Sequence, residues 1–136
     1  MKKIQLLFLL TFIMVGFVAC DKEDEKSLTD QNKENLIGNW KFVSSSTNGV
    51  QDNNGTCETM STISFTSDKI NGTDYWGENC SESENYSYNY TVNDNSITVT
   101  KPDGTFISEI VTLNATGLVI KDVVESETYL SVYIKQ

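Results

Sequence analysis

The sequence predicts an all-β protein, a single small up-and-down antiparallel β-barrel of about eight strands. After Leu36, apolar and polar residues alternate repeatedly and show no helical period. The alternating segments are separated by turns, most of which are short enough for hairpins. The length of 136 residues suits one domain. Eight strands joined in this way can close and leave no free sheet edge, whereas a β-sandwich, the alternative, needs a long crossing connection.

The N-terminus has the order of a secretory signal. Met1-Lys2-Lys3 is positively charged, residues 4–19 are almost continuously apolar, and Cys20 follows a small residue. A membrane-spanning helix is the alternative, but this stretch is shorter than the roughly 20 residues that a span needs. The residues Phe17-Val18-Ala19-Cys20 resemble a bacterial lipobox. The resemblance implies a signal peptide over 1–19 that is cleaved before a lipidated Cys20, and a simple secreted protein is the other alternative.

A charged linker is expected next, and with Cys20 it covers residues 20–35. Asp21 to Lys26 are all charged, and such runs are usually solvated tethers. Lys22-Glu23-Asp24 also resembles the surface-export signal of lipoproteins in some Gram-negative bacteria. The expected location is therefore the bacterial cell envelope, as an outer-membrane lipoprotein, with the periplasmic and the surface-exposed face both open.

The folded part is expected to begin with a short helix over 30–37, because Asp30 is a typical N-cap and Gly38 a typical stop. Asn93-Asp94-Asn95 and Lys101-Pro102-Asp103-Gly104 are strong turn signals, and residues 47–55 and 77–85 are expected to be loops. The apolar residues of 106–113 do not alternate cleanly, which predicts a bulge or burial on both faces. The strands are expected at 40–46, 57–66, 70–76, 86–92, 97–99, 106–113, 118–124 and 128–135.

Composition excludes several classes of function. A net charge of −9 argues against nucleic acid as a partner, because nucleic acid needs a clustered positive surface. The chain has no histidine, which excludes a serine–histidine triad and a histidine-ligated metal site. No nucleophile–base pair is visible, so we expect no enzyme activity, no cofactor and no metal. Glu82 and Glu84 are interpreted as solvated loop residues.

Cys57 and Cys80 are the two cysteines left after Cys20, and an even pair in an exported protein predicts a disulfide. If Asp68 and Lys69 form a two-residue hairpin loop, the strand register also places Cys57 opposite Cys80.

Three tyrosines, Tyr86, Tyr88 and Tyr90, share one face of a predicted strand. If they point inward they pack together or line a cavity, and this is the interpretation we favour. If they point outward they form an exposed stripe suited to carbohydrate or protein contact.

A family resemblance rests on several weak motifs taken together. Gly38-Asn39-Trp40 matches the G-x-W motif of lipocalins, and Ile110, Leu113, Leu118 and Ile120 follow the late rhythm of bacterial lipocalin-like domain lipoproteins. With the lipobox, the chain resembles that family from Leu36 to Ile134, and the barrel domain is expected over residues 36–136. The resemblance implies that Gly38 and Trp40 form the floor of the barrel, and that Phe42 and Phe65 line a ligand site with the three tyrosines. The lipocalin arginine that stacks on this tryptophan is absent, and Lys135 is the only cation near the end of the last strand.

The resemblance implies a lipid-anchored lipocalin-like protein that binds a small apolar or amphipathic ligand, with the membrane as its other partner. The alternative is a non-catalytic surface protein with a filled barrel, which contacts a protein or glycan through loops or exposed tyrosines. The size of the cavity discriminates between the two, because small eight-stranded barrels range from filled to holding one ligand. The oligomeric state is not indicated by the sequence.

Overall fold

The computed structural model of the protein describes residues 25–136. The predicted signal peptide, the lipidated Cys20 and the Lys22-Glu23-Asp24 segment lie outside the described residues. No helix within 25–136 combines the length and the apolar character that crossing a membrane requires.

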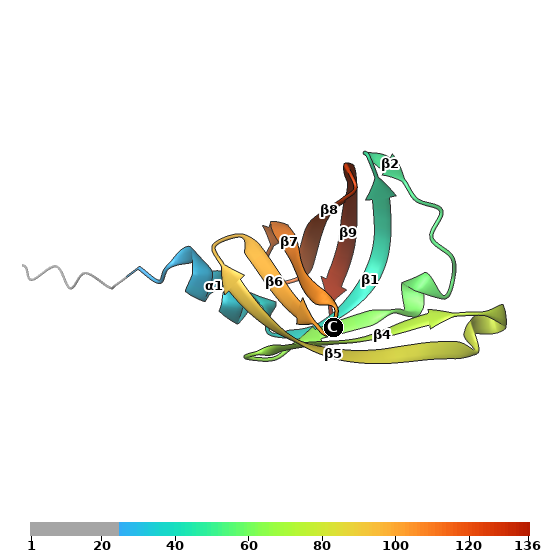
Figure 1. Ribbon diagram of the computed structural model, residues 1–136, viewed down its shortest axis with the longest axis horizontal. Coiled ribbons are helices and arrows are strands. Elements are labelled where there is room, and N and C mark those ends of the chain that lie inside the picture. Colours follow the sequence, from blue (N-terminus) through green and yellow to red (C-terminus); the bar gives the residue numbers. More distant parts are fainter. Residues whose placement is uncertain (1–24) are drawn as a thin grey trace, which may run out of the picture.

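The described chain is one helix followed by antiparallel strands (Figure 1). The helical elements are α1 (Leu28–Leu36) and two single-turn 3₁₀ helices, η1 (Glu58–Met60) and η2 (Glu78–Cys80). The strands are β1 (Gly38–Thr47), β2 (Val50–Gln51), β3 (Thr62–Phe65), β4 (Lys69–Trp76), β5 (Glu82–Asn93), β6 (Ser96–Lys101), β7 (Gly104–Leu113), β8 (Gly117–Val124) and β9 (Glu127–Lys135).

The sheet closes on itself as an up-and-down barrel. From β3 to β9 each strand pairs with the next one in sequence, β1 pairs with β3, and β9 returns to pair with β1 from Trp40↔Lys135 to Thr47↔Tyr129. The short β2 is an addition that pairs only with the end of β1. The prediction of an all-β, up-and-down barrel of about eight strands is therefore confirmed.

Strand pairing is interrupted along one edge of β1, the edge away from β9. β3 pairs with β1 only as far as Lys41, and β2 pairs with it only from Ser46. The segment between β2 and β3 satisfies the freed backbone groups of Ser45, whose amide donates to Asn54 Oδ1 at 2.8 Å and whose carbonyl accepts from the Asp52 amide at 2.9 Å. A loop therefore takes the place of a strand along this edge.

Several predicted boundaries were wrong, each for a local reason. The helix begins at Leu28 rather than Asp30 because Ser27 is its N-cap and accepts from the Asp30 amide at 3.1 Å. The strand expected at 57–66 starts at Thr62 because η1 occupies residues 58–60. The expected loop 77–85 is shorter than predicted, because β5 begins at Glu82, which pairs with Trp76. The predicted bulge in 106–113 is confirmed by the register shift between Ile110 and Thr112.

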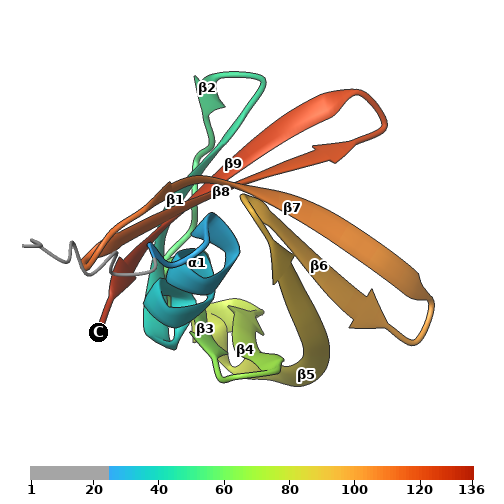
Figure 2. The ribbon, with the colours of Figure 1, turned by 90° about the vertical axis from the view of Figure 1, so that its left-hand side faces the viewer.

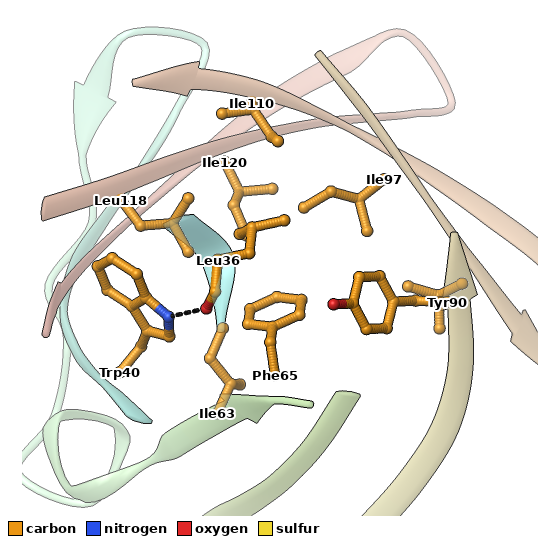
Figure 3. Close-up of a cluster of buried hydrophobic side chains, with 10 residues drawn as sticks. Leu36, Trp40, Ile63, Phe65, Tyr90, Ile97, Ile110, Leu118 and Ile120 are labelled. Carbon is orange, nitrogen blue, oxygen red and sulfur yellow. Dashed lines mark hydrogen bonds between the residues drawn. The ribbon is translucent and has the colours of Figure 1, made fainter. Parts of the chain in front are cut away.

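The helix α1 covers one end of the barrel (Figure 2). The hydrophobic core, to which Leu36 of α1 belongs, fills that end. Leu36 from α1 and Trp40 from β1 are completely buried, and Asn32 of α1 donates to the Asp94 carbonyl at 2.9 Å. The helix is thus fixed to the barrel by an apolar contact and by a hydrogen bond to the β5–β6 turn. Figure 3 shows the core side chains converging from opposite strands: Leu36, Trp40, Ile63, Phe65, Tyr90, Ile97, Ile110, Leu118 and Ile120.

Candidate functional site

The half of the barrel away from α1 is hollow. It holds two adjoining cavities of about 510 and 320 Å³. Ligand pockets in proteins typically have volumes of roughly 300–1,000 Å³. Six residues line both cavities: Ile63, Asp74, Tyr86, Phe106, Asp122 and Tyr133.

The tyrosines of β5 point into the barrel. Tyr86 and Tyr88 are half-buried, line the smaller cavity and stack with ring centroids 5.5 Å apart. Gly72, the register partner of Tyr86 on β4, makes room for the ring, since a Cβ there would lie 2.0 Å from Tyr86 Cζ. These tyrosines therefore do not form the exposed stripe that was one of the two contact surfaces considered for the alternative function.

Phe65 and Tyr90, two of the residues expected to line a ligand site, lie in the packed core. Their rings meet edge to face with centroids 5.2 Å apart, and Tyr90 Oη donates to the Thr66 carbonyl at 2.6 Å. Both side chains are buried with the core cluster rather than along the two cavities. They therefore belong to the packed core next to the cavities and do not line them.

Phe42 lines the larger cavity and is followed by a bulge in β1. Its ring meets that of Tyr133 edge to face, with centroids 5.7 Å apart. The register with β9 shifts between Phe42 and Ser44, so the extra residue, Val43, is 41% exposed. A bulge moves the following side chains to the other face of the strand, and Ser45 consequently also lines the cavity.

Trp40 lies at the opposite end of the barrel, beneath α1. Its indole nitrogen donates to the Leu36 carbonyl at 2.8 Å, the bond that Figure 3 marks, and the Lys135 ammonium lies 4.9 Å from the ring centroid. Lys135 is held there by donating to the Asn35 carbonyl at 3.0 Å. Gly38 permits this arrangement, since its φ is +134° and a Cβ would lie 2.8 Å from Lys135 Cε. A lysine thus supplies the cation over the tryptophan in a chain that has no arginine.

Cys57 and Cys80 form the predicted disulfide, with their Cα atoms 5.1 Å apart. The strand register predicted for this pair was wrong. Phe65 pairs with Ile70 and the Thr66 amide donates to the Lys69 carbonyl, so the hairpin loop is Ser67-Asp68. The cysteines meet through η1 and η2 instead, and the bond fastens the segment beside the larger cavity to the far end of the β4–β5 hairpin.

Two carboxylates in the cavity lining have perturbed acidity. Burial raises the pKa of Asp122, while the Ser108 hydroxyl and the charge of Lys101 act in the opposite direction. Asp74 lies at the exposed rim of the cavities, where Glu84 is its register partner on β5. Partial burial raises the pKa of Asp74 most, and the negative charge of Glu84 raises it further. Glu82 and Glu84 are strand residues, although both are exposed as expected.

Tyrosine hydroxyls complete the polar part of the cavity wall. Burial raises the pKa of Tyr133 to about 12, and burial and the Asp74 charge raise that of Tyr86. These phenols stay neutral at physiological pH and act as hydrogen-bonding groups. Within residues 25–136, no group of three or more acidic, histidine or cysteine side chains is arranged to hold a metal ion.

Phe106, Asp122 and Tyr133 were not predicted as site residues. Two of them carry a signal in the alternation of buried residues: Asp122 follows Leu118 and Ile120 at a period of two, and Phe106 precedes Ser108 and Ile110 in the same way. Extending each apolar alternation by one step places these residues inside the barrel.

The comparisons with known proteins concern the fold. The sequence model of the lipocalin-like domain family matches residues 36–120. The structure resembles a lipocalin-like protein from Bacteroides uniformis, with a TM-score of 0.58, 13% identity, and coverage of 75% of this chain and 99% of that one. It also resembles an uncharacterized protein from Bacteroides eggerthii, with a TM-score of 0.53, 12% identity, and coverage of 74% and 99%. Bovine odorant-binding protein complexed with undecanal gives a TM-score of 0.46 at 17% identity, over 85% of this chain and 77% of that one. No curated protein sequence matches the chain significantly.

Proposed function

The chain belongs to the lipocalin-like domain family, and we propose that it binds a small amphipathic molecule in the hollow half of its barrel. The observation that carries the proposal is the uneven filling of the interior. Side chains fill the barrel beneath α1, whereas a cavity of about 510 Å³ is left at the other end. A completely filled barrel would have favoured the alternative, a surface protein without a ligand.

The composition of the cavity wall supports an amphipathic rather than a purely apolar ligand. Phe42, Phe106 and Tyr133 offer aromatic surface, while Ser131 and Asp122 offer polar atoms beside it. An apolar lining with a few polar groups is the usual composition of a small-molecule site. The lipocalin-like fold is typically a binding fold, and we propose ligand binding rather than catalysis as the activity.

We also propose that the protein is a lipoprotein of the bacterial outer membrane, anchored by lipid on Cys20. Its parts would be a signal peptide over 1–19, the lipidated cysteine and linker over 20–35, and the barrel over 36–136. The support is the sequence alone: the apolar stretch that ends in Val18-Ala19-Cys20 and the charged residues after it. An anchor would hold the ligand-binding barrel at the membrane, on either its periplasmic or its outer face.

The ligand proposal is tested by titrating the purified protein with the neutral fluorescent probe N-phenyl-1-naphthylamine. We expect saturable binding of about one probe per barrel to the wild type. Ser131→Trp places a large side chain in the cavity and should abolish binding, whereas Thr112→Trp places the same side chain at an exposed position of β7 and should not. No saturable binding to the wild type, or equal binding to both variants, would refute the proposal.

A further inference from the structure

The interior of the barrel changes from apolar to charged along individual strands. On β8 the inward positions run from Leu118 and Ile120, both in the core, to Asp122 in the cavity wall. On β6 they run from Val99 to Lys101, and on β4 from Ile70 to Asp74. The polar groups of the interior are therefore concentrated around the cavity.

Asp122 is the charged residue of this wall that lacks a complete set of partners. Its Oδ1 atom is shielded from solvent and accepts no hydrogen bond from any described residue. Leaving a buried carboxylate oxygen unpaired is costly, and natural proteins tolerate such groups mainly at functional sites. A hydrogen-bond donor delivered into the cavity would give this carboxylate a partner.

Acidic groups predominate among the charged residues that line the cavities. These are Glu58, Asp74, Glu84 and Asp122, against the single cation Lys101. Lys101 does not neutralise Asp122 by a direct ion pair, since the ion pairs within residues 25–136 are Lys26–Glu34 and Lys121–Glu109. Its ammonium lies instead over the rings of Tyr88 and Phe106, 5.6 and 5.4 Å from their centroids.

This balance of charge discriminates between three kinds of amphipathic ligand. A carboxylate head group would bring a further negative charge beside Asp122 and Asp74, which is unfavourable in a partly desolvated site. A hydroxyl head group would supply a donor but no compensating charge. An ammonium head group supplies both, and hydrogen bonds between charged partners are about twice as strong as neutral ones.

We propose that the cavity selects amphipathic molecules that carry a protonated amine, with Asp122 as the deep acceptor and Asp74 and Glu84 as the acidic rim. This inference rests on the proposed function, because it specifies the ligand class of the same cavity. The apolar part of the ligand lies against Phe42, Phe106 and Tyr133, and the ammonium group points to the carboxylates.

The test is competition against bound N-phenyl-1-naphthylamine at pH 7 with three molecules that share one tail: octylamine, 1-octanol and octanoate. We expect octylamine to displace the probe at a concentration about tenfold or more below that of 1-octanol, with octanoate weakest. Asp122→Asn should remove the preference for octylamine while keeping probe binding. Asp103→Asn, which removes one charge from an exposed turn, should leave the preference unchanged.

The outcomes separate this inference from the proposed function. If the wild type does not bind the probe, the proposed function fails. If the probe binds and the three competitors are equivalent, or octanoate is strongest, only the amine preference is refuted. If Asp122→Asn does not fold, Asp74→Asn at the exposed rim serves in its place, with a partial loss of the preference expected. An undiminished preference in whichever of these variants folds would also refute the assignment.

Discussion

Replacing Trp40 removes one of the contacts that hold α1 against the end of the barrel that it covers, the closed end. The side chain is completely buried, its indole nitrogen donates to the Leu36 carbonyl at 2.8 Å, and the Lys135 ammonium lies 4.9 Å from its ring. Trp40→Ala therefore deletes core packing, leaves a buried carbonyl without a partner and releases a cation. Trp40→Phe keeps an aromatic ring in the core and removes the indole hydrogen bond.

The expected magnitudes differ between the two variants. Truncation of a buried tryptophan to alanine lowers the free energy of unfolding by about 3–5 kcal/mol. The phenylalanine variant should lose about 1–3 kcal/mol, the usual cost of leaving a buried polar group unpaired. Small domains have a total stability of only about 5–15 kcal/mol, so Trp40→Ala should remove a large share of it.

Trp76 provides the matched control. It is 42% exposed at the end of β4, and its indole nitrogen donates to Glu82 on the neighbouring strand. Trp76→Ala should lower the free energy of unfolding by about 1 kcal/mol or less, as is usual for surface positions. Urea midpoints followed by circular dichroism measure all three variants. Equal midpoints for the two alanine variants, or a nearly native Trp40→Ala, would show that Trp40 does not hold the closed end together.

Three further predictions concern separate parts of the chain. Cys57→Ser breaks a disulfide whose cysteines are 23 residues apart in the sequence, and it should lower the free energy of unfolding by about 3 kcal/mol, measured as a lower melting temperature. Two free thiols in the unfolded, unreduced wild type would refute the bond. The folded pKa of Asp122 is raised, so its ionisation opposes folding as pH rises through that pKa. Asp122→Asn should therefore have a higher melting temperature than the wild type at pH 7. This difference should vanish below about pH 4, where the carboxyl group is protonated in both the folded and the unfolded protein. A lower melting temperature of Asp122→Asn at pH 7 would contradict the inference that burial destabilises the ionised carboxylate. Cys20→Ser should move the protein from the membrane fraction to the soluble exported fraction or leave it unprocessed, and retained lipid labelling would disprove the anchor.

The barrel was predictable because alternation and turn chemistry are local properties. Buried Trp40, Ile97 and Val99 lie on strands that the period of two identified, and the turn at Lys101–Gly104 is the hairpin that proline and glycine indicated. What local patterns do not determine is register. The β3–β4 loop lay one residue earlier than expected, at Ser67-Asp68 rather than Asp68-Lys69. Asp68 belongs to both candidate loops, whereas Ser67 is a more typical turn residue than Lys69.

The site was only partly predictable, because its shape depends on bulges and on how the strands close. Tyr86, Tyr88 and Phe42 were identified as candidate lining residues and lie at the cavities. Phe65 and Tyr90 share the inward face but lie at the α1 end, and depth along a barrel is set by strand stagger rather than by the alternation itself. Asp122 was not predicted as a site residue, although it lies within the strand expected at 118–124 and shares the inward face of Leu118 and Ile120.

The most direct test of the ligand-binding proposal is to map N-phenyl-1-naphthylamine onto the protein by NMR with ¹⁵N-labelled wild type. If the hollow half of the barrel is the binding site, the largest amide shifts will occur at Phe42, Phe106 and Tyr133 and will saturate together. Ile97 in the filled half should shift little. An absence of shifts, or shifts confined to the exposed outer face around Ile107 and Val123, would contradict the account.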